Sequence, residues 1–329
     1  METIFVTGAT GAIGASLVKQ LVERGKKVKA LVRDLNRAKL ILPSNCELVL
    51  GDVTSKESIL KGMEGTDTVF HAAGLPEQWF KNPKIFQEVN VNGTKNILDS
   101  AVTMGIKKFI YTSTIDVFEG FAGKEYNEKK IDPNPKHTYY ERSKQEADKL
   151  AVKALQKGLD VVFLHPSGVY GPGPGKSPGA NQFIKDLILG KIPLLLPGGF
   201  PVVYVDDCAL GHILAFEKGK KGDRYILSDR YISLLDLAKL VNEIHSLNKI
   251  PKVMPFWIAK SISIVGESFS PISGNPPLLP KGQLEFLRWQ AIPNASRAKK
   301  ELGWQPIDLK EGIKKTINFL FQNKESNHS

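Results

Sequence analysis

The sequence predicts an α/β fold in which a doubly wound parallel sheet carries a smaller lobe that is mostly C-terminal. Short apolar strands alternate with amphipathic helices through the first half of the chain, which is typical of a parallel sheet covered by helices on both faces. A glycine-rich turn at residues 8–14 joins the first strand to the first helix. An irregular Gly/Pro run at 171–175 marks where the smaller lobe begins.

The expected elements follow from hydrophobic periodicity and from residues that begin or end helices. Five further strands are expected at 27–33, 47–50, 68–71, 107–112 and 160–166. Helices are expected after the glycine turn, at 54–61 with Thr54 or Ser55 as its cap, at 83–104 and at 140–156. The second half should add strands at 202–205 and 224–227, and helices at 206–216 capped by Asp206 and Asp207, at 233–244 and at 309–321.

The glycine turn has the spacing Gly8-x-x-Gly11-x-x-Gly14. Gly8 and Gly11 remove side chains where the backbone must turn sharply and approach a pyrophosphate, and Gly14 lets the helix pack closely on the strand. The positive end of the helix then faces the phosphates. Placed between a strand and a helix, the turn predicts a bound dinucleotide and a Rossmann-type sheet; an ordinary glycine turn is the alternative.

We therefore expect residues 1–170 to form a Rossmann dinucleotide-binding domain. Residues 171–329 should form mainly a substrate-binding lobe, with 202–248 returning to the Rossmann body. The apolar region after residue 251 either lines a lipophilic pocket or, for most of its aromatic residues, packs in the core. These aromatic residues are Trp257, Phe269, Phe286 and Trp289.

The end of the second strand indicates which dinucleotide is bound. NAD-binding folds usually place an acidic residue there for the ribose 2′-hydroxyl, whereas an arginine favours a 2′-phosphate. Val32 occupies the acid position and Arg33 follows it, with Arg37 and Lys39 close behind. NADP(H) is therefore favoured. NAD(H) is the alternative, because a change of register by one residue would bring Asp34 to the ribose.

Hydroxyl groups and a Tyr/Lys pair supply the candidate chemistry. Ser113 and Thr114 follow the strand at 107–112, at the edge where open parallel sheets bind ligands. Tyr140 and Lys144 are four residues apart on a helix, so the phenol and the ammonium can reach one site. A free phenol ionises near pH ~10, and an ammonium together with an oxidised nicotinamide ring stabilises the phenolate. Tyr140 is thus the candidate acid and base; a chance surface pair is the alternative.

The amino-acid composition limits the classes of binding partner and the cellular compartment that we expect. The formal charge of +11 and the pI near 9.4 come from scattered Lys and Arg, so we expect a solvated basic surface and no specific nucleic-acid partner. Cys46 and Cys208 lack metal-ligand spacing, which indicates a reducing compartment and no zinc. We see no signal-peptide pattern, and the apolar stretch at 253–266 is too short to span a bilayer. We expect a cytoplasmic protein; peripheral membrane contact through 253–266 is the less favoured alternative.

The order of these motifs resembles the extended short-chain dehydrogenase/reductase family, within the NAD-dependent epimerase/dehydratase superfamily, along almost the whole chain. The sequence looks most like the branch of 3β-hydroxysteroid dehydrogenases and dihydroflavonol 4-reductases. Hopanoid-associated sugar-epimerase-like proteins share Trp79 and Val205-Asp206-Asp207 with it. The segments that carry the resemblance are residues 7–14, 51–52, 71–74, 90–94, 111–114, 140–144, 165–173, 205–207 and 302–304.

The resemblance implies that Tyr140 is the general acid and base and that Lys144 binds the nicotinamide ribose and favours the Tyr140 phenolate. Thr114 would hydrogen-bond the substrate oxygen where the family usually has Ser, with Ser113 as the other candidate. Arg33 is expected at the 2′-phosphate and Asp52 at the adenine, although Asp52 is equally expected as an exposed turn residue. The remaining expected cofactor contacts are Gly8, Thr10, Gly11, Ala12, Ile13, Gly14, Val53, Ala72, Ala73, Gly74, Asn90, Thr112, Ser113, Pro166 and Val169.

These residues favour an NADP(H)-dependent oxidoreductase that interconverts a carbonyl and an alcohol on an apolar small molecule, steroid-, flavonoid- or aldehyde-like. The first alternative is an NAD-dependent nucleotide-sugar epimerase, and the second is a non-catalytic NAD(P)-binding sensor. Sugar dehydratases of the family carry an Asp-Glu pair after the catalytic Thr, where this chain has Ile115 and Asp116, which argues against dehydration. By analogy with the family, a homodimer would pair through the helices at 83–104 and 140–156.

Overall fold

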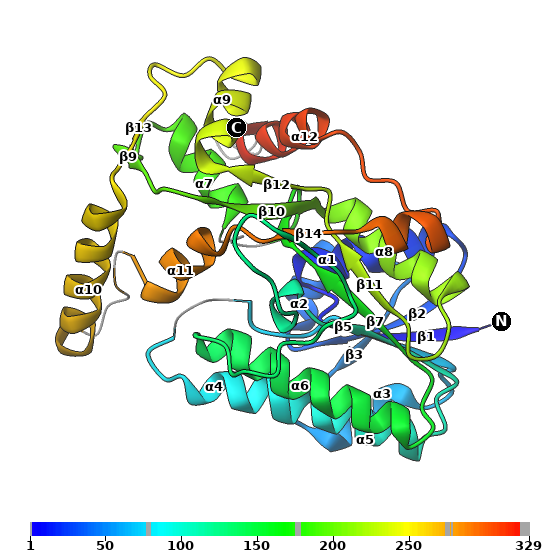
Figure 1. The fold of residues 1–329 in the computed structure, drawn as a ribbon. Coiled ribbons are helices and arrows are strands. Elements are labelled where there is room, and N and C mark those ends of the chain that lie inside the picture. Colours follow the sequence, from blue (N-terminus) through cyan, green and yellow to red (C-terminus); the bar gives the residue numbers. More distant parts are fainter. Residues whose placement is uncertain (1, 77–79, 175–178, 274–276, 278, 323–329) are drawn as a thin grey trace.

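The protein, described here by a computed structural model, is built on one twisted parallel sheet (Figure 1). The structure describes residues 2–76, 80–174, 179–273, 277 and 279–322. The seven strands lie in the order β11-β7-β5-β4-β1-β2-β3. Their bounds are β1 Thr3–Thr7, β2 Lys27–Val32, β3 Glu47–Leu50, β4 Thr68–His71, β5 Lys108–Thr112, β7 Val161–Pro166 and β11 Arg224–Leu227. The predicted doubly wound α/β fold is confirmed.

Side chains alternate along each strand and so create two cores, one on each face of the sheet. Ile4 and Val6 of β1 pack on one face, whereas Phe5 between them packs on the other. The first face is covered by α1 (Ala12–Glu23), α2 (Leu35–Ile41) and α8 (Val205–Lys218). The opposite face is covered by α3 (Lys56–Met63), α5 (Thr94–Thr103) and α6 (Tyr139–Gln156) (Figure 1).

The strand order reverses between β1 and β4, which lie side by side. In open parallel sheets this reversal leaves a crevice at the carboxyl ends of the two strands, where ligands bind. The turn after β1 and the segment after β4 both reach this crevice. The fold therefore places the glycine turn and the expected catalytic residues along the same sheet edge.

The helix predicted at 83–104 consists of three joined parts. It begins with α4 (Lys84–Phe86), continues as a π-helical segment (Gln87–Gly93) and ends with α5. The π-helical part places Gly93 where an added Cβ would lie 2.8 Å from Val53 Cγ2. A π-helical turn inserts an extra residue into a helix and is frequent at functional sites.

The second lobe lies over the carboxyl edge of the sheet, at the top of Figure 1. A three-stranded sheet is formed by β8 (Gly168–Tyr170), β10 (Gly199–Tyr204) and β12 (Arg230–Ser233). It shares an apolar core with α7 (Ala180–Ile188), α9 (Leu234–Ile244) and α12 (Leu309–Gln322). The outer elements are β6 (Glu125–Tyr126), β9 (Leu194–Leu195), β13 (Lys252–Val253), α10 (Phe256–Ser273), α11 (Lys281–Trp289) and β14 (Ile292–Pro293).

Several expected boundaries differ from the structure. Of residues 202–248, α8 and β11 pack on or join the main sheet and Val203 of β10 contributes to its core, whereas β12 and α9 pack in the lobe. Asp206 and Asp207 lie inside the first turn of α8 and do not cap it, because the helix begins directly after β10. Ser55, not Thr54, caps α3.

Candidate active site

The glycine turn leaves the start of α1 open for an anion. Gly11 is the N-cap and supplies no side-chain hydrogen bond to the first backbone N–H groups of the helix. An added Cβ on Gly8, whose φ is +71°, would lie 2.6 Å from the carbonyl of Ala72, and one on Gly14 would lie 2.1 Å from the Gly8 carbonyl oxygen. Both glycines are thus required by close backbone contacts. An uncapped helix start beside such a turn fits the pyrophosphate of a dinucleotide.

Arg33 and Asp52 lie together at the ends of β2 and β3. The Arg33 Nε atom is 3.9 Å from Asp52 Oδ2, and the Arg33 side chain is 76% exposed. Asp34 caps α2, because its carboxylate accepts a hydrogen bond from the Arg37 N–H at 3.0 Å. The Oδ1 atom of Asp34 is therefore engaged by its own helix. Asp52 also accepts from the backbone N–H of Thr54 at 2.8 Å.

The segment after β4 is held by Asn90 from the π-helical segment. The Asn90 Oδ1 atom accepts from the Leu75 N–H at 2.8 Å, and Nδ2 donates to the Leu75 carbonyl at 3.3 Å and to Ser143 Oγ at 2.9 Å. Asn90 is 1% exposed. Its amide therefore joins the segment after β4 to α6, and its expected contact with the cofactor stays a prediction.

Thr112, Ser113 and Thr114 point to three different partners. The Thr112 hydroxyl lies 3.0 Å from His212 Nε2, and Ser113 Oγ donates to Asp148 Oδ1 at 2.9 Å. Thr114 Oγ1 donates to Asp116 Oδ2 at 2.8 Å. Both Ser113 and Thr114 thus give their hydroxyl proton to a carboxylate, and Thr114 stays the candidate for the substrate oxygen on the family resemblance, with Ser113 as the alternative.

Tyr140 and Lys144 occupy the first turns of α6. Thr138 and Glu141 form a reciprocal capping box at the start of this helix, which fixes its first turn. Lys144 is buried and its Nζ donates to the Thr112 carbonyl at 2.9 Å, so its ammonium is held at the end of β5 beside the hydroxyl residues. Burial lowers the pKa of Lys144 to about 8, against the raising effect of the Asp148 and Asp116 charges. The Tyr140 ring contacts Phe86, with ring centroids 6.5 Å apart.

A buried ion pair behind Lys144 was not expected from the sequence. Asp148, one helical turn after Lys144, binds the Arg224 guanidinium of β11 through hydrogen bonds of 3.1 and 2.8 Å. His165 Nε2 lies 3.2 Å from Arg224, and burial first, then the Arg224 charge, lowers the pKa of His165 to about 3. The spacing of Tyr140, Lys144 and Asp148 on one helix face is the signal that could have indicated Asp148.

The remaining residues expected to contact the cofactor lie in or next to the elements already described. Thr10, Ala12 and Ile13 belong to the glycine turn and the first turn of α1, and Val53 follows β3. Pro166 ends β7, and Val169 lies in β8 opposite Val203 of β10. His71 is a packed neutral histidine: its ring nitrogens lie 2.7 Å from Thr7 Oγ1 and 3.0 Å from Thr94 Oγ1, and burial lowers its pKa to about 3.

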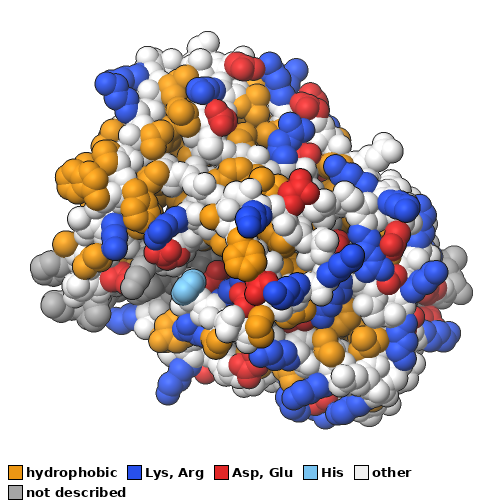
Figure 2. Space-filling view, in the orientation of Figure 1, with side chains coloured by type: hydrophobic (Ala, Val, Ile, Leu, Met, Phe, Trp, Pro, Cys, Tyr) orange, Lys and Arg blue, Asp and Glu red, His pale blue; other side chains and the backbone are white. Residues whose placement is uncertain are grey.

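The late aromatic residues have different environments. Trp289 packs against Tyr126 and donates from Nε1 to the Gly120 carbonyl at 2.8 Å, as expected for a core residue. Trp257 on α10 is 69% exposed, so it neither packs in the core nor lines an enclosed pocket. Hydrophobic side chains gather over the start of α10, at the left of Figure 2. Trp79 and the side chain of Phe269 lie outside the described residues.

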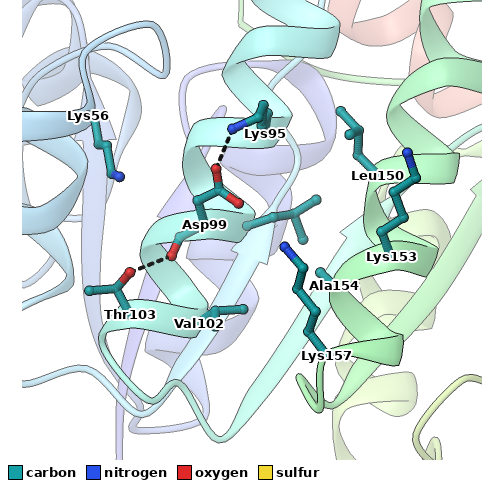
Figure 3. A pocket seen from close by; sticks show the side chains of 10 residues that line it. Lys56, Lys95, Asp99, Val102, Thr103, Leu150, Lys153, Ala154 and Lys157 are labelled. Carbon is teal, nitrogen blue, oxygen red and sulfur yellow. Dashed lines mark hydrogen bonds and ion pairs between the residues drawn. The ribbon is translucent and has the colours of Figure 1, made fainter.

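A shallow groove of about 510 Å³ lies away from this crevice, between α3, α5 and α6 (Figure 3). Its charged lining residues are Lys56, Lys95, Asp99, Lys153 and Lys157. Asp99 is paired with Lys95 at 2.6 Å. The two longest helices of this face are those through which we expected a homodimer. On the view in Figure 2, basic side chains are spread among acidic and apolar ones.

The comparisons with known proteins give the family. Residues 4–228 match the model of the NAD dependent epimerase/dehydratase family. The chain belongs to this family. It is an NAD(P)-dependent oxidoreductase of the extended short-chain dehydrogenase/reductase type. Within the described residues, no helix is both long enough and apolar enough to cross a bilayer.

Individual relatives cover nearly the whole chain. A putative dihydroflavonol 4-reductase from Synechocystis is 30% identical over 98% of this chain and 95% of the relative. The 3beta-hydroxysteroid-dehydrogenase/decarboxylase isoform 1 of Arabidopsis thaliana is 28% identical over 98% of this chain and 80% of its own length. The crystal structure of gox2253 superposes with a TM-score of 0.84 at 28% identity, covering 98% of this chain and 99% of that one. A Thermotoga maritima UDP-glucose 4-epimerase, at 24% identity and a TM-score of 0.78 over 98% of this chain and 99% of its own, shares the fold.

Proposed function

We propose that the protein is an NADP(H)-dependent oxidoreductase that interconverts a carbonyl and an alcohol on an apolar small molecule. One observation carries this proposal: Lys144 is buried and bound to the Thr112 carbonyl, so that its ammonium, Thr114 and the first turn of α6 with Tyr140 surround the end of β5. A bound nicotinamide dinucleotide would supply or accept the hydride at this position.

The chain's own residues would manage the proton and the oxygen. Tyr140 donates its phenolic proton to the carbonyl oxygen as the alcohol forms, and takes it back in the reverse direction. Thr114 donates a hydrogen bond to the same oxygen and so stabilises the negative charge that develops on it. The Lys144 ammonium stabilises the phenolate that Tyr140 leaves behind.

The NADP(H) preference rests on Arg33. Arg33 directly follows Val32, which ends β2 and occupies the position where an acid would bind an unmodified ribose, and a guanidinium can bind a phosphate through two parallel hydrogen bonds. Asp34, the nearest carboxylate in sequence, is engaged as the cap of α2. An apolar substrate is supported by the names of two relatives, a dihydroflavonol reductase and a hydroxysteroid dehydrogenase.

The reaction is tested by a screen of ketosteroids, flavonoid ketones and apolar aldehydes with NADPH and with NADH. We expect reduction of at least one apolar carbonyl, and we expect Tyr140→Phe to lose about 10²- to 10⁴-fold in kcat/KM, because the proton donor is absent. Tyr139→Phe is the matched control, since Tyr139 precedes it on α6 and is 58% exposed. Full turnover by Tyr140→Phe would disprove the mechanism.

The cofactor is tested by fluorescence titration with NADPH and NADH. We expect tighter binding of NADPH, and loss of that preference in Arg33→Ala but not in Arg24→Ala, an exposed arginine at the far end of α1. Preference for NADH, or NAD that stays bound through purification, would instead favour the nucleotide-sugar epimerase.

A further inference from the structure

Two hydrogen bonds join Thr114 and Asp116 next to the catalytic residues, and in one of them Thr114 Oγ1 accepts from the Asp116 backbone N–H at 3.3 Å. The Thr114 hydroxyl donates to Asp116 Oδ2 at 2.8 Å, and the side chains are 5% and 6% exposed. A hydroxyl has one proton to donate. While that proton is given to Asp116, Thr114 presents only lone pairs to a substrate. A carbonyl oxygen also carries only lone pairs, so the two could not form a hydrogen bond.

The other oxygen of Asp116 has no protein partner among the described residues. Oδ1 is buried and forms no hydrogen bond there. A buried carboxylate with an unsatisfied oxygen is unfavourable, and protonation removes most of that penalty. A protonated Asp116 would be able to donate to Thr114 Oγ1, which reverses the direction of their hydrogen bond.

The charges around Asp116 partly cancel. The titratable groups that face it are Lys136, Glu141 and Lys144 at and before the start of α6, and Tyr126 on β6. Lys136 is itself paired with Asp132 at 2.7 Å, and Glu141 is engaged in the capping box. Burial and then the Glu141 charge raise the pKa of Asp116 to about 7, while the Thr114 hydrogen bond and the two lysine charges oppose them. His165, which lies 3.1 Å from the Thr114 carbonyl, is neutral at this pH.

We propose that Asp116 is a positioning residue that sets the direction of the Thr114 hydrogen bond. The protonated carboxyl donates to Thr114 Oγ1 and frees the threonine proton for a carbonyl oxygen, whereas the carboxylate retains that proton. This inference rests on the proposed function, in which Thr114 binds the carbonyl. In the reduction, Tyr140 gives the proton that becomes the alcohol proton, and Asp116 keeps its own throughout.

The inference predicts how reduction depends on pH. Because the protonated carboxyl is the competent form, kcat/KM for carbonyl reduction is full below neutrality and falls as pH rises through about 7. Loss of one hydrogen-bond donor to a developing oxyanion lowers the rate by about 10²- to 10³-fold, which sets the plateau at high pH.

Asp116→Asn tests this directly. Its amide can donate to Thr114 Oγ1 at every pH, so we expect the fall of kcat/KM through neutrality to disappear and activity at pH about 8.5 to exceed that of the wild type. Asp132→Asn is the electrostatic control, because it removes a carboxylate paired with Lys136 and leaves the Thr114–Asp116 contact intact. We expect Asp132→Asn to shift the pH at which kcat/KM falls, but not to abolish the fall. If Asp116→Asn keeps the wild-type profile, the inference is wrong.

A spectroscopic measurement covers the case in which Asp116→Asn does not fold or no substrate is reduced. Infrared pH titration of the wild-type protein, without substrate, should show the carbonyl stretch of a buried protonated carboxyl that disappears near pH 7. Burial also raises the pKa of Asp207 to about 6, so the Asp116 band is the one that Asp116→Asn or Thr114→Val changes and Asp207→Asn does not. Thr114→Val should shift that band, since the hydroxyl partner is lost. If no such carboxyl titrates near neutrality, Asp116 does not act as proposed, even where carbonyl reduction is established. If the carboxyl titrates as expected but no carbonyl is reduced, the proposed function fails instead.

Discussion

The Asp148 carboxylate of α6 binds the Arg224 guanidinium of β11 through two hydrogen bonds, of 3.1 and 2.8 Å. This pair joins the helix that carries Tyr140 and Lys144 to the edge strand of the main sheet. Burial alone would raise the pKa of Asp148, but the hydrogen bond and charge of Arg224 hold it below its ordinary value.

We expect Arg224→Met to lower the free energy of unfolding at pH 7 by about 3–5 kcal/mol, because it leaves a buried carboxylate without its partner. Arg230→Met is the control: that arginine is 50% exposed in its own ion pair and should contribute less than about 1 kcal/mol. The wild-type pair stabilises the fold above the unfolded-state pKa of Asp and loses that contribution as pH falls through the lowered native pKa. Urea unfolding at neutral and acidic pH measures both effects. Equal losses for the two variants would show that the buried pair contributes no more than a surface one.

The buried Lys144 ammonium, which the proposed reaction needs, should lower the free energy of unfolding. Its native pKa of about 8 lies below the ordinary lysine pKa of 10.5, so the unfolded chain binds the proton more tightly. The destabilisation is complete below pH 8 and is relieved as pH rises from there toward 10.5. Relative to Lys144→Met, the wild type should gain about 2 kcal/mol of stability between pH about 7 and about 9.5. Chemical denaturation of both proteins at the two pH values tests this, and a difference independent of pH would contradict it.

Asn90 joins two elements of the fold, so its replacement should lower the free energy of unfolding. Asn90→Leu has nearly the same size but leaves the Leu75 N–H and carbonyl without the amide, so we expect a loss of about 1–3 kcal/mol. Asn92→Leu, at an exposed position two residues away, should change stability by less than about 0.5 kcal/mol. Thermal and urea unfolding measure the difference. Indistinguishable variants would mean that the Asn90 contacts contribute little.

The lysines around the groove in Figure 3 should oppose self-association through α5 and α6. A two-fold dimer on this face would bring like charges together, and salt screens such repulsion. We therefore expect sedimentation equilibrium to show stronger self-association at about 0.5 M than at about 0.05 M NaCl. Lys153→Gln should weaken this salt dependence, whereas Lys39→Gln, on α2 of the opposite face, should not. Association that weakens with salt would point to another interface.

Local patterns were sufficient for the main sheet but not for the network around the site. The strands are mostly apolar runs bounded by turns and helices, and the glycine spacing defines the first crossover, so each could be predicted from nearby residues. Tyr140 and Lys144 were found because helix geometry joins positions four apart. Arg224 was missed because its partner Asp148 is 76 residues away in sequence and is brought to it only by the strand order.

The same distinction applies to Asn90, Ser113 and Trp257. The family resemblance implies cofactor contacts for the first two, which stay predictions; the sequence did not show that their polar atoms are engaged by Leu75, Ser143 and Asp148 across the fold. Trp257 is apolar and aromatic, which favours burial in a sequence-based argument. Its 69% exposure follows from the arrangement of α10, which periodicity does not determine.

The π-helical segment Gln87–Gly93 changes which way side chains point along one long helix. Each residue of an α-helix advances by about 100° around the helix axis. One inserted residue therefore rotates the side chains before it by that angle relative to the side chains after it. Phe86, before the segment, can therefore contact Tyr140 while Ile97, after it, packs in the core beneath the sheet. Removal of a single residue here would restore a regular helix and force the chain to give up one of these two alignments. The active site and the core are thus matched by one residue of helical register.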